Sequence, residues 1–188
     1  MSAEHLNMVD GSLQCVPEWS DLPGNLQTVI AHGAAGSVGA MVTQLAREAG
    51  AYVIGTGRGA DRQKVLDLGA QEFIDLDSDT LADIGSVDLV FDVIGGDVQK
   101  NSAPLIKPGG ALVSVVGPVE ARPTDGLAID FVVEADRLGL TEIVQRVRDG
   151  RLRTNIGKIV SLDDAVASFT STARHSGKTV IRVLENGR

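Results

Sequence analysis

The sequence predicts an α/β fold in which helices cover both faces of a doubly wound, parallel sheet of about six strands. Short apolar runs alternate with segments of helical period from Gln27 to Gly150, an arrangement that requires crossover connections between parallel strands. Glycines number 22 and aromatic residues make up only 3%, which suits helices packed closely on strands of short aliphatic residues. One stretch, residues 28–39, joins an apolar strand to a glycine-spaced turn and a helix. These features predict the strand order 3-2-1-4-5-6.

The bulk properties of the chain limit its partners and its chemistry. With 188 residues the chain can bury a core in one domain, and its net charge of −8 argues against nucleic acid or an anionic membrane surface as a partner. The single cysteine, Cys15, excludes an internal disulfide and a cysteine-based zinc cluster. No apolar run could span a bilayer and no secretory signal pattern is present, so we expect no membrane partner and a cytoplasmic location.

The first strand–helix–strand unit contains the glycine-spaced turn. Its first strand is predicted at Gln27–Ala31 and its helix at Val38–Ala49, where apolar residues recur at helical spacing. Gly50 is placed to end this helix in the left-handed conformation. The second strand is predicted at Tyr52–Gly55, and residues 56–59 are predicted to form the loop after it.

The rest of the sheet is predicted from the same alternation of apolar runs and helical segments. Further strands are expected at Glu72–Asp75, Val87–Val93, Ala111–Val116 and Ile129–Val133, and further helices at Asp61–Leu68, Asp97–Ile106 and Arg137–Asp149. A turn at Pro108-Gly109-Gly110 is expected before the fifth strand, because proline and glycine favour a change of chain direction.

The two ends of the chain differ from this central domain, residues 26–150. Residues 1–25 show no clear period and are expected to form an irregular arm, in which Ser12–Val16 is the one candidate strand. Residues 151–188, called the tail below, should contain a strand at Lys158–Val160 and a final strand at Thr179–Leu184. Between them a helix is expected to begin at Ser161, in a capping box with Asp164, and to run to about Ala173.

The glycine-spaced turn is the strongest functional signal in the sequence. It follows the spacing G-x-x-G-x-x-G, with a strand before it and a helix after it, which is the context that a dinucleotide-binding turn requires. Gly33 permits the tight turn, Gly36 has no Cβ to obstruct a phosphate, and Gly39 allows close helix packing. Backbone N–H groups at this helix start can bind a pyrophosphate. The predicted cofactor-binding residues are Gly33, Ala34, Ala35, Gly36, Ser37, Val38 and Gly39. The alternative is an ordinary glycine-rich turn.

The end of the second strand predicts the kind of cofactor. A site that prefers NAD places a carboxylate there, on the 2′-hydroxyl of the ribose, but this sequence has Thr56, Gly57 and Arg58. Thr56 and the forked guanidinium of Arg58 can bind a 2′-phosphate, and Lys64 on the following helix is a second candidate cation. We therefore expect NADPH. The alternative places Arg58 in a solvated loop and Lys64 on a solvated helix face, and for Lys64 alone that alternative is favoured.

No further catalytic constellation is evident. His5, His32 and His175 are scattered without metal-ligand spacing, and a structural or solvent-facing role suits His32 better than catalysis. Ser12, Ser37 and Ser114 lack the surroundings of a nucleophile elbow, so no catalytic residue and no metal site are assigned. A reaction that uses the predicted NADPH would need no protein nucleophile, because the nicotinamide itself carries the hydride.

A set of ordered motifs identifies a family. The motifs are His32-Gly33-Ala34-Ala35-Gly36-Ser37-Val38-Gly39, Gln44-Leu45-Ala46-Arg47, Leu68-Gly69-Ala70, Phe91-Asp92-Val93-Ile94-Gly95-Gly96, Leu105-Ile106-Lys107-Pro108-Gly109-Gly110 and Gly177-Lys178-Thr179-Val180. From Gln27 to Leu184 they are ordered as in the medium-chain dehydrogenase/reductase superfamily, and the chain resembles its zinc-independent NADPH:quinone oxidoreductase branch.

The resemblance implies a Rossmann sheet, a small-molecule hydride acceptor and further cofactor contacts. By resemblance, Val93, Ile94 and Gly95 contact the ribose of the nicotinamide. The residues implied to line the nicotinamide itself are Val116, Gly117, Phe131, Val132 and Val133. The alternative for the last three is core or dimer packing, because the family often forms homodimers by pairing its sixth strands.

The resemblance also points to a missing partner. In the family a GroES-like catalytic domain precedes the nucleotide domain, whereas here about 25 residues precede the first strand. The tail normally packs on that catalytic domain, so its apolar residues, such as Ile156, Ile159, Val166 and Phe169, should lack partners and favour association. The chain could be an excised domain, a natural truncation or half of a split enzyme.

Three functions are compatible with these residues. The first is an NADPH-dependent enzyme, or the cofactor half of one, that reduces a quinone or an activated double bond. The second is a non-catalytic NADPH-binding module whose tail recruits a partner. The third is an enoyl-reductase domain of a polyketide synthase, a branch with the same motifs.

Overall fold

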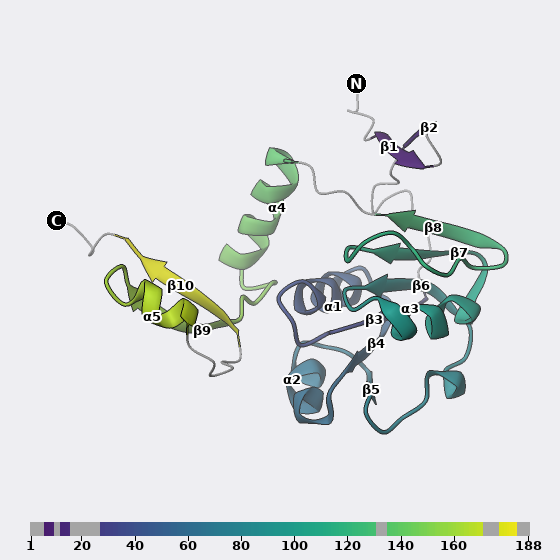
Figure 1. The fold of residues 1–188 in the computed structure, drawn as a ribbon, viewed down its shortest axis with the longest axis horizontal. Helices are drawn as coiled ribbons and strands as arrows, with labels where there is room; N and C mark the ends of the chain where they lie inside the picture. The colour runs from purple at the N-terminus through teal and green to yellow at the C-terminus, as the bar shows by residue number, and fades with distance from the viewer. Residues whose placement is uncertain (1–5, 10–11, 16–26, 131–134, 171–176, 184–188) are drawn as a thin grey trace.

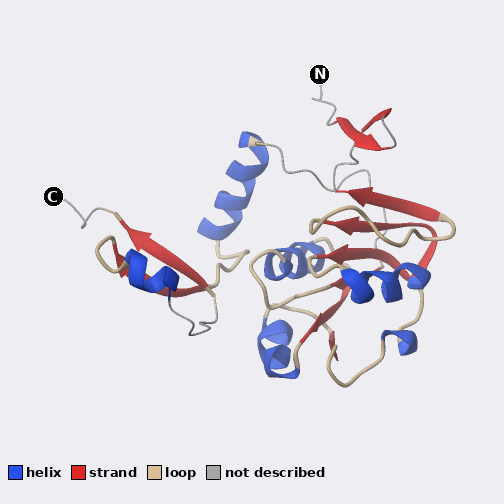
Figure 2. Cartoon of the chain, in the orientation of Figure 1, coloured by secondary structure: helices blue, strands red, loops and turns tan. Residues whose placement is uncertain are grey.

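A six-stranded parallel sheet forms the centre of the molecule (Figures 1 and 2). The computed structural model describes residues 6–9, 12–15, 27–130, 135–170 and 177–183. The strands of the sheet are β3 (Thr28–Ala31), β4 (Tyr52–Gly57), β5 (Glu72–Asp75), β6 (Val87–Asp92), β7 (Ile106–Ser114) and β8 (Gly126–Asp130). They lie in the order β5-β4-β3-β6-β7-β8, which confirms the predicted doubly wound order with the glycine-turn strand in the middle.

Alternating side chains of the central strands build a core on each face of the sheet. Val29 packs on one face with residues of α1 (Gly39–Glu48) and α2 (Arg62–Asp67), and this cluster includes Ala46 and Val65. Ile30 points to the other face, into a second cluster that is completed by Leu105. This face carries the helical turns η2 (Leu81–Asp83) and η3 (Ala103–Leu105) and the helix α3 (Gly96–Ser102). Successive side chains of β3 therefore pack against helices on opposite faces of the sheet.

The ends of β4 and α3 differ from prediction. β4 continues to Gly57, so Thr56 and Gly57 lie in the strand, and the 3₁₀ turn η1 (Gly59–Asp61) follows it. α3 ends at Ser102 and continues as the 3₁₀ turn η3, because Pro104 has no N–H with which to extend the α-helical hydrogen bonds.

β7 and β8 also begin earlier than predicted. The segment Pro108-Gly109-Gly110, predicted as a turn, lies within β7, where the pairing with β6 shifts register. Gly110 pairs with Gly126, and a Cβ on Gly126 would stand 2.7 Å from the Gly110 carbonyl oxygen. The two glycines thus allow a close backbone approach that extends both strands. The predicted Phe131–Val133 end of the sixth strand lies outside the described residues.

The amino-terminal arm contains a hairpin that the sequence pattern did not predict. β1 (Leu6–Val9) pairs antiparallel with β2 (Ser12–Cys15), so the candidate strand at Ser12–Val16 is present but has an unexpected partner. Val16 lies outside the described residues.

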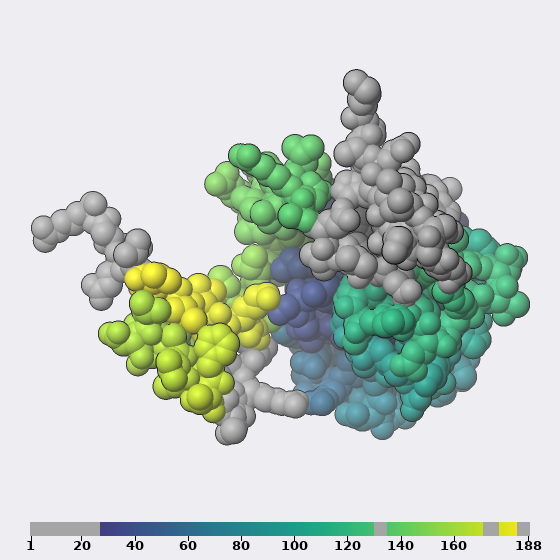
Figure 3. All heavy atoms as spheres, turned by 45° about the horizontal axis from the view of Figure 1, so that its top comes forward, coloured from purple at the N-terminus to yellow at the C-terminus, as the bar shows by residue number. Residues whose placement is uncertain are grey.

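The tail forms a separate small unit beside the sheet (Figures 1 and 3). After α4 (Arg137–Arg148), the strand β9 (Ile156–Ser161) pairs in parallel with β10 (Lys178–Arg182), and α5 (Ala165–Thr170) connects them. The helix was predicted to begin at Ser161, but Ser161 ends β9 and α5 begins at Ala165. Of the predicted capping box the described residues show one half: the Asp164 N–H donates to the Ser161 hydroxyl oxygen at 3.2 Å, while that hydroxyl donates to the Asp164 carboxylate at 2.7 Å. None of the helices in the described parts of the chain is long and apolar enough to cross a membrane.

Candidate functional site

Three loops meet at the carboxyl edge of the sheet, where β3, β6 and β7 end side by side. A Cβ on Gly33, in the turn after β3, would lie 2.7 Å from Cγ2 of Val93, in the loop after β6. A Cβ on Gly95 would lie 3.5 Å from Cγ1 of Val116, just beyond β7. The fold therefore brings together the predicted pyrophosphate turn and two of the segments implied to bind the nicotinamide half of the cofactor.

The glycine turn needs glycine at its first and last positions for different reasons. Gly33 has φ +58°, in the left-handed region, and its carbonyl oxygen accepts a 2.8 Å hydrogen bond from the Gly36 N–H. A Cβ on Gly39 would overlap that same carbonyl group. Gly36 is exposed, and the nearest atom to a Cβ placed there is the Gly33 oxygen at 3.1 Å. Gly33 and Gly39 thus determine the shape of the turn. Gly36 has no side chain, so it leaves the outer face of the turn unobstructed.

The start of α1 offers backbone donors. The N-cap residue Val38 provides no side-chain cap, and the amides of Ser37, Val38 and Gly39 have no acceptor among the described residues. Unpaired N–H groups at the positive end of a helix dipole favour an anion. This arrangement, with the exposed Gly36 beside it, fits the pyrophosphate of a dinucleotide.

A buried hydrogen-bond chain supports the turn from below. Nδ1 of His32 lies 2.8 Å from the Thr56 hydroxyl oxygen, and Nε2 lies 2.7 Å from the hydroxyl oxygen of Ser102. The Ser102 hydroxyl donates its single proton to the Val98 carbonyl at 2.7 Å, so Nε2 of His32 must donate to Ser102 and Nδ1 must accept from Thr56. Burial lowers the pKa of His32 to about 4, although the charge of Asp92 opposes this shift. His32 is therefore a neutral structural residue at neutral pH.

Asp92, at the end of β6, organises the loops on the nicotinamide side. The fully buried carboxylate accepts hydrogen bonds of 2.9 Å from the amides of Ile94 and Gly95 through Oδ1. Its Oδ2 accepts from Gln99 Nε2 at 2.8 Å and from the Ser114 hydroxyl at 3.1 Å. Burial raises the pKa of Asp92, but these four hydrogen bonds outweigh it and hold the pKa below the usual 3.8. Asp92 is therefore ionised at neutral pH.

The predicted 2′-phosphate residues occupy three different environments. Thr56 is fully buried, with its hydroxyl on His32, so its side chain is not placed to hold a phosphate as expected. Lys64 Nζ donates to the Ala35 carbonyl at 2.8 Å, so this lysine ties α2 to the glycine turn and is not simply a solvated side chain. The Arg58 side chain is exposed, and its guanidinium makes no hydrogen bond or ion pair with the described residues.

Sequence analysis missed the residues that support the site. Asp92, Gln99, Ser102 and Ser114 received no role, yet all four are buried polar residues. His32 has the structural one of the two roles expected for it, because it is buried and hydrogen-bonded through both ring nitrogens. The common signal of these residues is a polar side chain at the end of an apolar strand or on the inner face of a helix. Of the implied nicotinamide contacts, Gly117 is exposed beside Val116, and Phe131–Val133 lie outside the described residues.

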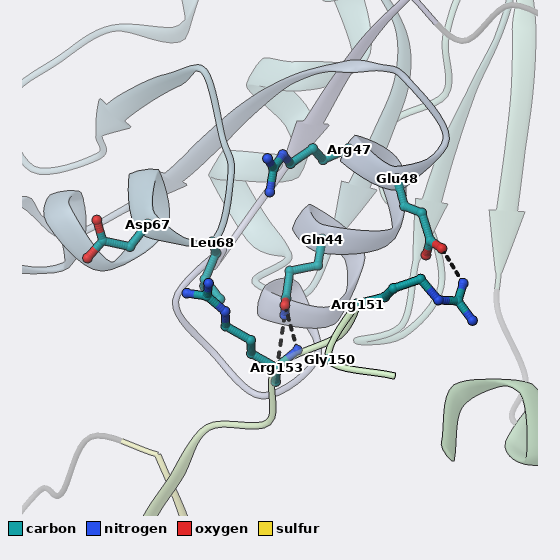
Figure 4. Close-up of a pocket in the computed structure, with 8 residues that line it drawn as sticks. All are labelled: Gln44, Arg47, Glu48, Asp67, Leu68, Gly150, Arg151 and Arg153. Atoms are coloured by element: carbon teal, nitrogen blue, oxygen red, sulfur yellow. Dashed lines mark hydrogen bonds and ion pairs between the residues drawn. The ribbon is translucent and has the colours of Figure 1, made fainter. Parts of the chain in front are cut away.

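A hollow of about 330 Å³ lies at the other end of α1 and is not part of this site. Figure 4 shows Gln44 reaching the first residues of the tail: its amide oxygen accepts from the Arg153 N–H at 2.8 Å, and its Nε2 donates to the Arg153 carbonyl at 3.1 Å. Glu48 forms ion pairs with Arg151 and Arg146 beside the hollow. These contacts fix the connection between the domain and the tail.

No group of His, Cys, Asp and Glu side chains in the described parts of the chain is arranged to hold a metal ion.

Comparison with known proteins places these features in a family. The family model for zinc-binding dehydrogenases matches residues 68–181. The medium chain reductase pydE of an Acremonium species is 29% identical over 191 residues, which cover 84% of this chain and 52% of that protein. The quinone oxidoreductase of Mus musculus is 27% identical over 180 residues, covering 84% of this chain and 54% of that protein.

A solved structure shows the same architecture. The quinone oxidoreductase from Coxiella burnetii superimposes with a TM-score of 0.74 at 28% identity and covers 86% of this chain and 55% of its own. The chain thus spans about half the length of the curated relatives it matches. The family match, the glycine turn and the sheet order agree, and the chain belongs to the zinc-binding dehydrogenase family of medium-chain dehydrogenase/reductases, of which it represents the nucleotide-binding part.

Proposed function

We propose that the chain is the NADPH-binding domain of an oxidoreductase that reduces a quinone or an activated, enone-like double bond. The observation that carries this proposal is the meeting of the glycine turn with the loop at Val93–Gly95 and with Val116 at one edge of the sheet. Open α/β sheets bind their ligands at this edge, where the strand order reverses. The oxidoreductase relatives support the same class of reaction.

Each part of the cofactor has proposed contacts on the chain. The unpaired amides of Ser37, Val38 and Gly39 would bind the pyrophosphate, and Arg58 would bind the 2′-phosphate. The loop at Val93–Gly95 and Val116 would hold the nicotinamide end. When bound, the nicotinamide supplies the hydride, and the protein positions it.

The acceptor needs a second wall. Hydride transfer requires the acceptor to be held against the nicotinamide in a cleft that excludes water. We propose that this wall is the catalytic domain typical of the family, on the same or another polypeptide, and that it covers apolar tail residues. Phe169 and Val166 are 82% and 74% exposed in this chain and would be part of that contact.

Titration calorimetry with NADPH and with NADH tests the cofactor proposal directly. We expect saturable, one-to-one binding of NADPH that is tighter than the binding of NADH. If neither NADPH nor NADH binds, the proposal is contradicted. Equal affinities for the two would contradict the choice of NADPH.

A further inference from the structure

We propose that Asp92 is a positioning residue that orders the nicotinamide end of the cofactor site without touching the cofactor. The inference rests on the proposed NADPH site and goes beyond it, because it assigns a role to a buried carboxylate outside the set of cofactor contacts. Its basis is the number of loop amides that this one side chain fixes, directly or through one intermediate residue.

The direct contacts fix the loop after β6. The amides of Ile94 and Gly95 both donate to Oδ1 of Asp92 at 2.9 Å. Gly95 has φ +77°, so the loop turns sharply where these two bonds hold it. Because Val93 of this loop lies against Gly33, the carboxylate also sets how the loop meets the pyrophosphate turn.

The indirect contacts fix the segment after β7. Ser114 is the neighbour of Asp92 across the sheet, and its hydroxyl donates to Oδ2 at 3.1 Å while its oxygen lies 3.4 Å from the Val116 amide. Gln99 donates to Oδ2 at 2.8 Å, and its Oε1 accepts from the Glu120 amide at 2.7 Å. One carboxylate thus connects the two loops that should flank the nicotinamide.

The chemistry of this cluster requires a carboxylate rather than an amide. All four groups that face Asp92 are donors: two backbone amides, the Gln99 amide and the Ser114 hydroxyl. The orientation of the Gln99 amide is fixed, because its oxygen is already occupied by Glu120. The NH₂ group of an asparagine at position 92 would face donors, whereas a carboxylate is acceptor-only.

The experiment compares the whole cofactor with its adenosine half. Adenosine 2′,5′-bisphosphate lacks the nicotinamide, so the two ligands report separately on the two ends of the site. For Asp92→Asn in the full chain we expect calorimetry to give an NADPH affinity lower by about tenfold, the order expected when hydrogen bonds that order a loop are lost. The affinity for adenosine 2′,5′-bisphosphate should stay within about twofold of the unmodified chain.

A matched control lies on the same strand. The carboxylate of Asp88 also accepts two backbone amides, those of Gln27 and Thr28, and pairs with Lys107, but it lies at the opposite end of β6. Asp88→Asn should leave the ratio of the two affinities unchanged. If Asp92→Asn does not fold, Gln99→Met provides the second test. It removes the bond from Gln99 to Asp92 and the link to Glu120, but it leaves the bonds from Ile94, Gly95 and Ser114 to Asp92 in place, and it should likewise weaken NADPH alone.

The outcomes separate this inference from the proposed function. Loss of both affinities to the same extent in Asp92→Asn, or loss of neither, would overturn the positioning role while the NADPH site stands. An unmodified chain that binds neither ligand would overturn the proposed function and, with it, this inference.

Discussion

Nε2 of His32 lies 2.7 Å from the hydroxyl oxygen of Ser102, although the two residues are 70 positions apart in the chain. The bond joins the residue before the glycine turn to the last residue of α3, on the second face of the sheet. Together with the bond from Thr56, it links the residue before the glycine turn to β4 and to α3.

The buried, neutral His32 predicts a pH dependence of stability. Below pH 6.5 the unfolded chain protonates His32, whereas the folded chain, with a pKa of about 4, does not. The unfolded state therefore binds more protons between these values, and this residue's contribution to the unfolding free energy falls as the pH is lowered from 6.5 to 4. The expected slope is about 1.4 kcal/mol per pH unit, or about 3 kcal/mol over the whole window.

Urea unfolding at pH 7, 6 and 5 measures this effect against a His32→Gln variant. The variant should be less stable at pH 7 and should lack this part of the slope. Identical slopes in both proteins would show that His32 is not buried in its neutral form.

The glycine turn predicts a separation of stability from binding. Gly39→Ala should lower the unfolding free energy by about 1–3 kcal/mol, because its Cβ would overlap the backbone of Gly33. Gly36→Val should change stability little but weaken NADPH and NADH alike, because its side chain would occupy the outer face of the turn. Thermal unfolding and calorimetry on both variants check this, and normal NADPH binding by Gly36→Val would contradict a pyrophosphate site there.

Arg58 should discriminate between the two cofactors. Replacing it by alanine should cost about 1–3 kcal/mol of NADPH binding free energy, the range for hydrogen bonds to charged groups, and little for NADH. Arg148→Ala is the matched control, since Arg148 is also exposed but lies on α4. Equal losses for both cofactors in the Arg58 variant would refute its contact with the 2′-phosphate.

The apolar tail should promote association. Val166 and Phe169 lie one helical turn apart on α5 and are strongly exposed. Replacing both by serine should weaken self-association by at least about tenfold, because full burial of each such side chain is worth about 1.5–3 kcal/mol. Sedimentation velocity over a range of concentrations measures it. Leu127→Asp on the edge strand β8 tests the competing route, and a loss of association there alone would assign the dimer to paired sixth strands.

The chain alone should be a poor catalyst. One wall of the acceptor cleft is proposed to lie on another domain, so a steady-state assay with NADPH and a small quinone should give little turnover. A monomer that turns over on the order of 10 times per second, as a complete enzyme does, would show that the second wall is not needed.

The sequence was sufficient for the sheet and insufficient for the supports of the site. Apolar runs and the glycine turn are local signals, and they predicted the central place of β3 and the strand order. The hairpin partner β1 was missed even though Asp10-Gly11, the strongest short hairpin signal, separates the two strands in the sequence. Pro108 was read as a turn residue, but the register shift between β6 and β7 allows the strand to include it.

The polar supports could not be predicted because their partners are remote in sequence. His32 meets Ser102, and Asp92 meets Ser114, only after the sheet has formed. Thr56 shows the same limitation: its residue type suits a phosphate ligand, and only the fold reveals that its hydroxyl faces His32.

The helix α1 has ten residues and is therefore about 15 Å long. It begins at Gly39, in the proposed pyrophosphate turn, and near its other end Gln44 and Glu48 bind Arg153 and Arg151, at the start of the tail. The two ends of α1 thus contact the proposed cofactor site and the tail. A partner that binds the tail would contact the unit that is attached to α1, and the first turn of α1 faces the proposed cofactor site. Binding of a partner to the tail should therefore change the affinity for the cofactor.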